Sequence, residues 1–238
     1  MIELRKNQLA FVLILVLIVL LVVYGAYKLM NSRTVQLVGS IVNHIDTEEK
    51  LVALTFDDGP TNNVEALLPL LEEYDAKATF FLIGSELEQN MELGEAIADA
   101  GHQIGNHTYS HKRMVFKLPS YIKEEIESTD SLIRDTGFEG EIDFRPPYGK
   151  KLIGLPIFLE KNNRETITWN LEPDKFYQSA KDKIQYVKEN ITPGSIILLH
   201  PMYDKTGEEW NTTEGILDAL SKDGYIFVTV NELQEAGS

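Results

Sequence analysis

The stretch LVALTFDDGP at residues 51–60 decides the fold of this chain. Residues 51–56 are almost wholly apolar and predict a strand that is buried on both faces, as strands of parallel sheets are. The polar pair Asp57 and Asp58 follows this strand directly, and Gly59 and Pro60 favour a turn after it. The stretch therefore predicts a buried parallel strand that carries carboxylates at its end.

Strands and helices alternate from this stretch towards the C-terminus. Strands are predicted at residues 51–56, 78–83, 102–106, 142–145, 165–170, 195–200 and 225–230, and helices at 64–74, 85–100, 120–135, 180–190 and 213–222, with Asn231 as the cap of a final turn. This alternation indicates an α/β protein, either a barrel or an open doubly wound sheet. No internal repeat, low-complexity tract or Pro/Gly-rich linker divides the domain.

An apolar run without charge or proline covers residues 9–24 and, extended to Tyr27, reaches 19 residues. A membrane-spanning helix needs about 20. Signal peptides usually have a shorter apolar region of roughly 7–15 residues, and a helix buried in a globular core is not apolar on every face. We therefore expect an uncleaved membrane anchor at 1–27, with a cleaved, secreted form as the alternative.

The rest of the chain is expected to be a juxtamembrane spacer at 28–48 and a folded domain at 49–238. The charges that flank the apolar run give only a weak positive-inside bias. A single N-terminal anchor before a whole domain usually exports that domain. The expected location is therefore the cell membrane, crossed once, with the domain outside the cytoplasm.

Composition excludes several classes of protein. The chain has no cysteine, which excludes disulfides, thiolate metal sites and a lipoprotein anchor. It has 37 acidic and 22 basic residues, a net charge of −15. Such a surface repels nucleic-acid backbones and is not attracted to an anionic membrane. We expect a monomer that does not bind nucleic acid.

Polar clusters follow four of the predicted strands. They lie at residues 57–60, 106–111, 145–149 and 200–201. Barrels and open α/β sheets build their sites at the carboxyl ends of the strands. The four clusters are therefore expected to converge on one pocket.

The histidines and aspartates of two clusters suggest a metal site. His107 and His111 are four residues apart, which puts both imidazoles on one side of a helical turn. With one carboxylate they make a ligand set that leaves positions open for water. Asp57 and Asp58 suit a hydrolytic site, in which one carboxylate binds the ion and the other acts as a base. The alternatives are hydrogen-bonding histidines and an ordinary Asp-Gly-Pro turn.

Arg145 and His200 each have a structural and a functional interpretation. Arg145 precedes two prolines, so it is either a salt-bridging residue beside a rigid turn or a guanidinium that orients the base and keeps it ionised. His200 ends an apolar strand and is either a core histidine bonded to the backbone or a general acid that protonates a leaving amine.

The four clusters also match a known family. The motifs are TFDDGP at 55–60, HTYSH at 107–111, RPPYG at 145–149 and LLHP at 198–201. In this order, the domain resembles the polysaccharide deacetylases of carbohydrate esterase family 4, the NodB-type homology domain, over residues 51–233. Four ordered motifs at strand ends make the resemblance specific.

The resemblance implies a distorted (β/α) barrel of about seven strands and a divalent metal, usually Zn²⁺, with Co²⁺, Ni²⁺ and Mn²⁺ as alternatives. Asp58, His107 and His111 would bind the metal. Asp57 would be the general base and His200 the general acid. Further roles implied by the family are Arg145 holding Asp57, the Tyr148 N–H stabilising the oxyanion, and Leu198 lining the acetyl pocket; the substrate contacts expected are Pro60, Tyr148, Trp169, Glu172, Asp174, Phe176 and Leu198.

One family motif, Asp-x-x-Asp-Trp, is altered. Without gaps, Glu172 takes the place of its first Asp, Lys175 of its second and Phe176 of its Trp. The second Asp normally supports the catalytic histidine, and here Asp174 and Glu172 are the candidates to replace it. Phe176 is expected to wall the sugar groove by stacking.

The expected function is deacetylation of N-acetylglucosamine or N-acetylmuramic acid units in peptidoglycan or a related, chitin-like extracellular polysaccharide. The alternatives are an O-acetyl esterase on xylan-like glycans and a non-catalytic glycan-binding homologue. The absence of a G-x-S-x-G elbow disfavours a Ser/His/Asp hydrolase. Gly-rich nucleotide-binding motifs are absent too.

Overall fold

The computed structural model describes residues 2–237, and its centre is the strand predicted from residues 51–56. This strand, β2 (Leu51–Asp57), pairs with β3 (Ala78–Leu82) on one side and β6 (Ile196–Leu199) on the other. β4 (Gln103–Asn106) lies beside β3, and β7 (Ile226–Phe227) pairs with the start of β2. A shorter pair joins β1 (Ile41–Val42) to β5 (Thr166–Ile167). All of these pairs are parallel, as the apolar strands predicted.

Single-residue bridges close these strands into a ring. Phe144 bridges in parallel to Asn106 at the end of β4 and to Thr166 in β5. Leu171, just beyond β5, bridges in parallel to Ile197 in β6. The ring therefore runs from β2 through β3, β4 and β5 to β6 and back to β2. The expected distorted (β/α) barrel is confirmed.

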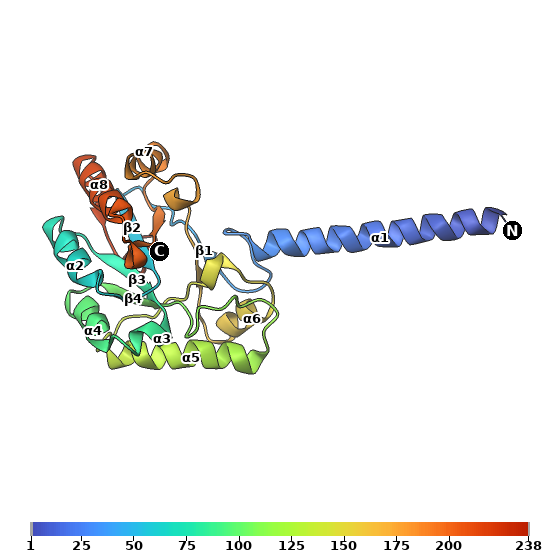
Figure 1. Cartoon of the computed structure of the whole chain (residues 1–238), viewed down its shortest axis with the longest axis horizontal. Helices are drawn as coiled ribbons and strands as arrows, with labels where there is room; N and C mark the ends of the chain where they lie inside the picture. Colours follow the sequence, from blue (N-terminus) through green and yellow to red (C-terminus); the bar gives the residue numbers. More distant parts are fainter. Residues whose placement is uncertain (1, 238) are drawn as a thin grey trace.

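Helices cover the outside of the barrel (Figure 1). They are α2 (Val64–Glu73), α3 (Gly84–Leu87), α4 (Met91–Asp99), α5 (Pro119–Asp135), α6 (Gly154–Lys161), α7 (Ala180–Asn190) and α8 (Glu208–Lys222). The last helix, α9 (Val230–Ala236), packs Val230 and Leu233 against the inner cluster that contains Ala53 and Phe81. Three 3₁₀ turns follow strand ends, at Pro147–Gly149, Pro173–Lys175 and Pro201–Tyr203. Each begins with proline, which has no N–H to leave unpaired in a first turn.

The alternation of side chains along β2 separates the core from the site. Val52, Leu54 and Phe56 belong to the large apolar cluster that packs under the helices. Ala53 belongs to a second cluster, with Phe81, Trp169 and Leu198 among its members. Thr55 and Asp57 share the face of Ala53, because side chains two apart in a strand point the same way. The strand therefore directs one carboxylate into the barrel.

Several elements differ from the sequence-based predictions. The strand predicted at 142–145 is reduced to the bridge at Phe144, because Pro146 and Pro147 cannot continue a ladder. The strand predicted at 165–170 is limited to Thr166–Ile167, and the helix predicted at 85–100 is divided into α3 and α4. Helix α6 was not predicted, and α8 begins at Glu208, five residues earlier than expected.

The last helix corrects two further predictions. α9 begins at Val230, so the preceding strand ends at Phe227 rather than at residue 230. Thr229, and not Asn231, is the N-cap: its hydroxyl accepts from the Glu232 N–H, and the Glu232 carboxylate accepts from the Thr229 N–H. This reciprocal capping box fixes the start of the helix.

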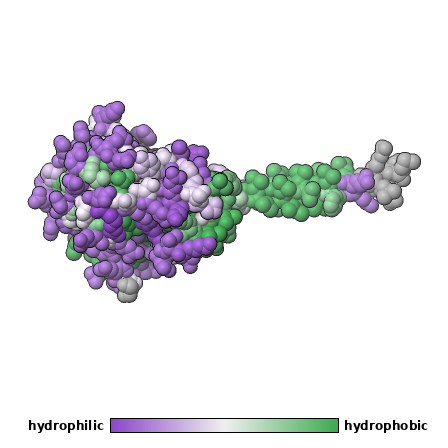
Figure 2. Space-filling view, turned by 90° about the horizontal axis from the view of Figure 1, so that it is seen from below, coloured by the Kyte–Doolittle hydropathy of each residue, from purple (hydrophilic) through white to green (hydrophobic). Residues whose placement is uncertain are grey.

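The N-terminal helix α1 (Ile2–Met30) projects from the domain (Figures 1 and 2). Its segment Asn7–Met30 has 24 residues, and the most apolar stretch of 18 residues within it has a mean hydropathy of 3.2 and is not buried. The helix is long and apolar enough to cross a membrane by length and composition.

The segment between α1 and β2 packs on the domain. The Lys151 N–H donates to the Met30 carbonyl (3.3 Å), and the Ile45 N–H donates to the Gly194 carbonyl (3.0 Å). β1 lies within this segment and pairs with β5. The residues expected to act as a spacer therefore contribute a strand to the fold.

Candidate active site

The polar clusters converge at the carboxyl ends of the strands. Asp57 is the last residue of β2, Asn106 ends β4, and His200 directly follows β6. Arg145 follows the bridging residue Phe144. The expected convergence of four segments is therefore present in the structure.

Asp58, His107 and His111 form a compact group of metal-ligand atoms. One ligand atom from each residue lies within 4.8 Å of the others. Asp58 Oδ1 is 3.4 Å from His111 Nε2 and 3.9 Å from His107 Nε2. This oxygen is buried and has no hydrogen-bond partner among the described residues. An orphaned carboxylate oxygen that faces two imidazole nitrogens is what a divalent cation would satisfy.

The two histidines are prepared to act as neutral ligands. His107 Nδ1–H donates to the Arg145 carbonyl (2.7 Å), so the lone pair on Nε2 faces Asp58. Such a hydrogen bond fixes the tautomer and orientation of a ligand imidazole. Burial lowers the pKa of both His107 and His111. The geometry and donor chemistry of the trio fit a divalent metal.

The backbone at this site is held in an unusual conformation. Four non-glycine residues have a positive φ: Asp58 (76°), Thr108 (68°), His111 (53°) and Tyr148 (60°). Such left-handed conformations cost of order 1 kcal/mol or more and cluster at functional sites. Three of the four residues are predicted ligands or catalytic groups, so their orientation is maintained against a local cost.

Asp57 and Arg145 form a buried ion pair inside the barrel. Arg145 is fully buried, and its Nη1 donates to Asp57 Oδ1 (2.7 Å) and to Thr55 Oγ1 (2.8 Å). Its Nη2 donates to the Thr168 carbonyl (3.1 Å). Burial would raise the pKa of Asp57, but the charges of Arg145 and His107 hold it below its usual value. Asp57 is therefore ionised, and its Oδ2 lies 3.6 Å from His107 Nε2.

His200 lies in a chain of ionic contacts. Its Nδ1–H donates to Asp174 Oδ2 (3.0 Å), and Asp174 Oδ1 lies 3.0 Å from Lys183 Nζ. Lys183 also donates to Glu209. Burial would lower the pKa of His200, but the hydrogen bond to Asp174 and the charge of Asp57 raise it to about 9. His200 is therefore a protonated donor at neutral pH.

Trp169 and Glu172 were predicted to contact the substrate, but their side chains contact each other and Arg33. Trp169 is only 5 % exposed, and the Arg33 guanidinium covers its ring at 3.6 Å from the centroid. Glu172 Oε2 accepts from Trp169 Nε1 (2.9 Å) and from Arg33 Nη2 (3.3 Å). Neither side chain is free to contact a sugar, which corrects the expectation for both. Burial of the indole, with its N–H satisfied by Glu172, explains the difference.

The remaining predicted substrate contacts are spread around the site. The Tyr148 ring is exposed and lies 4.9 Å from the His111 ring. Phe176 is exposed and packs 5.5 Å from Tyr186. Leu198 is buried in β6, and Pro60 is buried beside the Asp57–Asp58 turn. Tyr148 and Phe176 are accessible to a polymer, and a role for Leu198 and Pro60 stays a prediction.

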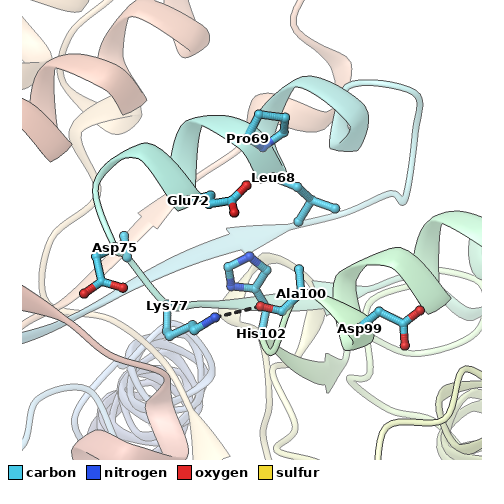
Figure 3. Close-up of a pocket in the computed structure, with 9 residues that line it drawn as sticks. Leu68, Pro69, Glu72, Asp75, Lys77, Asp99, Ala100 and His102 are labelled. Carbon is cyan, nitrogen blue, oxygen red and sulfur yellow. Dashed lines mark hydrogen bonds between the residues drawn. The ribbon is translucent and has the colours of Figure 1, made fainter.

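A separate hollow lies at the opposite ends of the strands (Figure 3). Lys77 and His102, which directly precede β3 and β4, are among the residues that line it. His102 Nδ1 accepts from the Ala78 N–H (3.3 Å), and burial near Lys77 lowers the pKa of His102 to about 4. A neutral histidine whose ring nitrogen is satisfied by a backbone N–H has a structural role, so this hollow is not part of the active site.

Three residues near the site were missed from the sequence. Arg33 comes from the segment between the membrane helix and the domain, and Lys183 and Glu209 come from α7 and α8. None belongs to a motif, and each pairs with a residue at least 26 positions away. Their only sequence signal is charge, which does not distinguish a buried ion pair from a solvated one.

Comparisons with known proteins agree with this geometry. A family model described as polysaccharide deacetylase matches residues 44–154. The chain is 32% identical over 205 residues to a peptidoglycan-N-acetylglucosamine deacetylase of Bacillus cereus, covering 82% of this chain and 93% of that protein. It is 33% identical over 192 residues to PgdA, the peptidoglycan-N-acetylglucosamine deacetylase of Listeria monocytogenes. That match covers 77% of this chain but only 39% of the Listeria protein.

Solved structures give the same picture. The crystal structure of the peptidoglycan N-acetylglucosamine deacetylase Bc1960 superposes with a TM-score of 0.76 at 29% identity, covering 81% of this chain and 92% of that one. A Bacillus anthracis protein described as a CE4 family pseudoenzyme, BA3943, superposes with a TM-score of 0.72 at 26% identity, covering 82% of this chain and 69% of that one. The same barrel is thus found in an active enzyme and in a pseudoenzyme.

Proposed function

The chain belongs to the polysaccharide deacetylase family, carbohydrate esterase family 4, and on this premise we propose that it removes acetyl groups from N-acetylglucosamine units of peptidoglycan. The observation that carries the proposal is the combination of an ionised Asp57, an orphaned Asp58 oxygen facing two neutral imidazoles, and a protonated His200. An inert homologue has no need to maintain a base and an acid in opposite protonation states.

Asp58, His107 and His111 are the residues that would hold the metal, and we propose Zn²⁺ for this set of nitrogen and oxygen donors. When bound, the ion supplies Lewis-acid polarisation of the acetamide carbonyl and of the attacking water.

The side chains of the chain itself carry the proton transfers. Asp57, held by Arg145, accepts the proton of the attacking water. The backbone N–H of Tyr148 donates to the oxyanion of the tetrahedral intermediate. His200 then gives its proton to the departing sugar nitrogen, and the products are acetate and a glucosamine unit.

The proposed setting of this reaction is the outer side of a cell membrane. Helix α1 would span the bilayer as an uncleaved anchor, with residues 49–238 as the catalytic domain outside the cytoplasm. Tethering to the membrane suits an enzyme that edits the wall of its own cell. We propose that the protein acts as a monomer.

The decisive experiment measures acetate release by the full chain in detergent micelles. Peptidoglycan, a chitooligosaccharide and acetylxylan are offered in parallel, with and without a chelator. We expect chelator-sensitive release from peptidoglycan. Release from acetylxylan alone would favour an O-acetyl esterase, and metal binding without release from any substrate would favour a glycan-binding homologue.

Two variants make the assignment specific. Asp57→Asn is expected to bind zinc as the wild type does and to release no acetate. His111→Ala is expected to lose metal affinity by more than the roughly 10–100-fold that outer-shell partners contribute. His102→Ala, at the other end of the barrel, is the matched control and retains the metal. Full activity of Asp57→Asn would refute the proposed base.

A further inference from the structure

The surface of the domain around the base of α1 has an unusual composition. Three stretches meet there, residues 28–45, 107–123 and 144–159, and none contains an aspartate or glutamate although the chain has 37. Contacts connect the three. Lys151 N–H donates to the Met30 carbonyl, Lys150 Nζ donates to Asn31, and a Cβ on Gly154 would lie 3.6 Å from the Lys117 carbonyl. We call residues 31–37, 112–118 and 150–153 the basal face.

The basal face is basic within a strongly acidic protein. Its cationic residues are Arg33, Lys112, Arg113, Lys117, Lys150 and Lys151, and Lys28 lies beside them in the last turn of α1. Lys112 and Arg113 are exposed. Arg33 is paired with Glu172 and Lys151 is buried, so Lys112, Arg113, Lys117 and Lys150 supply the accessible positive charge of the face. This distribution is an electrostatic asymmetry that the net charge conceals.

Large apolar side chains are exposed on the same face. Phe116 is 88 % exposed and Leu118 72 % exposed, and Val35, Leu37 and Ile153 are more than half exposed. Figure 2 shows hydrophobic surface on the domain next to the base of α1. An exposed apolar patch with a polar rim indicates an interaction surface.

The backbone of the loop strengthens this interpretation. Phe116 has a φ of 57°, a left-handed conformation that is unfavourable for an aromatic residue. The isolated domain gains no burial in return, because the ring points into solvent. Residues held in such conformations cluster at functional and ligand-binding positions.

We propose that the basal face lies on the anionic headgroups of the bilayer that α1 spans, with Phe116 and Leu118 between the lipids. This inference rests on the proposed membrane anchor. Basic residues that flank exposed aromatic and aliphatic ones are typical of interfacial membrane contacts. Asn31 and Lys150 are hydrogen bonded, so the face begins one residue after α1 ends. The acidic remainder of the domain is repelled from the same lipids, which fixes its orientation.

The contact places the active site beside the membrane. The Arg113 guanidinium lies 5.2 Å from the ring of Tyr148, which packs 4.9 Å from His111. The loop that touches the lipid therefore borders the site. An enzyme docked in this way deacetylates the glycan nearest to the membrane surface.

The test uses the full chain in lipid nanodiscs. One preparation contains only zwitterionic phosphatidylcholine, and the other includes about 30% anionic phosphatidylglycerol. Deuterium uptake is measured on peptides that cover residues 112–118. We expect uptake at least about threefold slower in the anionic discs than in detergent, with less protection in zwitterionic discs.

Variants separate the contact from general effects of the lipid. Phe116→Ser with Leu118→Ser, and Lys112→Glu with Lys117→Glu, are expected to lose the protection. Ile226→Ser and Lys188→Glu change exposed residues away from the basal face and are expected to keep it. If a basal-face variant does not fold, the deuterium uptake of the wild-type protein in the two disc compositions tests the contact instead.

Equal uptake by residues 112–118 in detergent and in both kinds of disc would overturn the inference. Acetate release from a soluble chitooligosaccharide in detergent is recorded in the same preparations. Its absence would count against the proposed function and leave the uptake result unaffected. The membrane contact and the proposed function can therefore be refuted independently of each other.

Discussion

Asp174 Oδ2 lies 3.0 Å from Nδ1 of His200, and this contact supplies the carboxylate support that the altered family motif lacks. A gap-free match puts Lys175 in that role, but the 3₁₀ turn Pro173–Lys175 directs the neighbouring Asp174 to the histidine. Lys183 binds the other oxygen of Asp174 (3.0 Å). His200, the proposed general acid, is therefore supported by a residue displaced by one position in the sequence.

Asp174→Asn is expected to slow deacetylation. Without the carboxylate, the pKa of His200 loses its principal raising contact and moves from about 9 towards its ordinary value. At pH 8 this reduces the protonated fraction, and hence kcat/KM, by roughly 10- to 30-fold. The measurement is kcat/KM on a chitooligosaccharide between pH 6 and pH 10. Lys175→Ala, which changes the residue aligned with the family Asp, is the control and should leave the profile unchanged; a reversed result would restore the gap-free alignment.

The wild-type pH profile is expected to have an alkaline limb near pH 9. His200 donates a proton in the reaction, and its pKa is raised to about 9, so activity falls as pH rises through that value. Stability follows the same sign: the contribution of protonated His200 is complete below its unfolded pKa of about 6.5 and is lost as pH rises through about 9. Rates and urea midpoints at the same pH values check both statements. A limb centred near pH 6.5 would show that Asp174 does not act on His200.

Arg145→Met is expected to destabilise the domain by about 3–5 kcal/mol, because it leaves the buried Asp57 without its cation. Arg145→Lys keeps the charge but cannot bond Asp57, Thr55 and the Thr168 carbonyl together. We expect it to fold and to release acetate about 100-fold more slowly, since small displacements of a base have effects of that size. Denaturation curves and acetate release distinguish the two variants. Wild-type rates in Arg145→Lys would mean that Asp57 is positioned without the guanidinium fork.

Arg33→Ala is expected to lower the free energy of unfolding by about 1–2 kcal/mol, because it removes a cation that stacks on Trp169. Arg33→Lys should recover only part of this, since an ammonium does not stack as a planar guanidinium does. Urea denaturation followed by tryptophan fluorescence measures the change. Lys50→Ala removes a more distant cation, 5.6 Å from the Tyr225 ring, and serves as the control. If both alanine variants unfold at the wild-type midpoint, the Arg33 contact contributes nothing to stability.

The motif residues were identified from the sequence because their chemistry is local. A strand that ends in Asp57 and Asp58, and two histidines four residues apart, restrict the backbone and the reachable partners within a few residues. The long apolar strands likewise predicted a parallel α/β fold, since burial on both faces leaves no polar face, and the family resemblance selected the barrel over an open sheet. The three predicted ligands do lie together, but residues 107–111 form no helical turn, because Thr108 and His111 have a positive φ; the expected turn was wrong although the convergence was predicted.

The residues that support the site could not be predicted from local patterns in the sequence. Helix α6 has no clear cap in the sequence, and Asn163 adopts a left-handed backbone just after it. Trp169 has the composition of a sugar-stacking residue, yet Arg33 and Glu172 enclose it. Exposure of a side chain depends on which distant segment covers it, and no local pattern specifies that.

The sequence by itself determined the parallel α/β class, the four motifs and an N-terminal helix able to span a membrane, because each depends on periodicity or spacing within one segment; the barrel followed from the family resemblance of those motifs. Only the tertiary structure decided that Asp174 supports His200, that Arg33 covers Trp169 and that three stretches without acidic residues form one face. The first two relations join residues that are 26 and 136 positions apart. Their energies arise from desolvation and pairing in the folded state, which exist only once the barrel has closed.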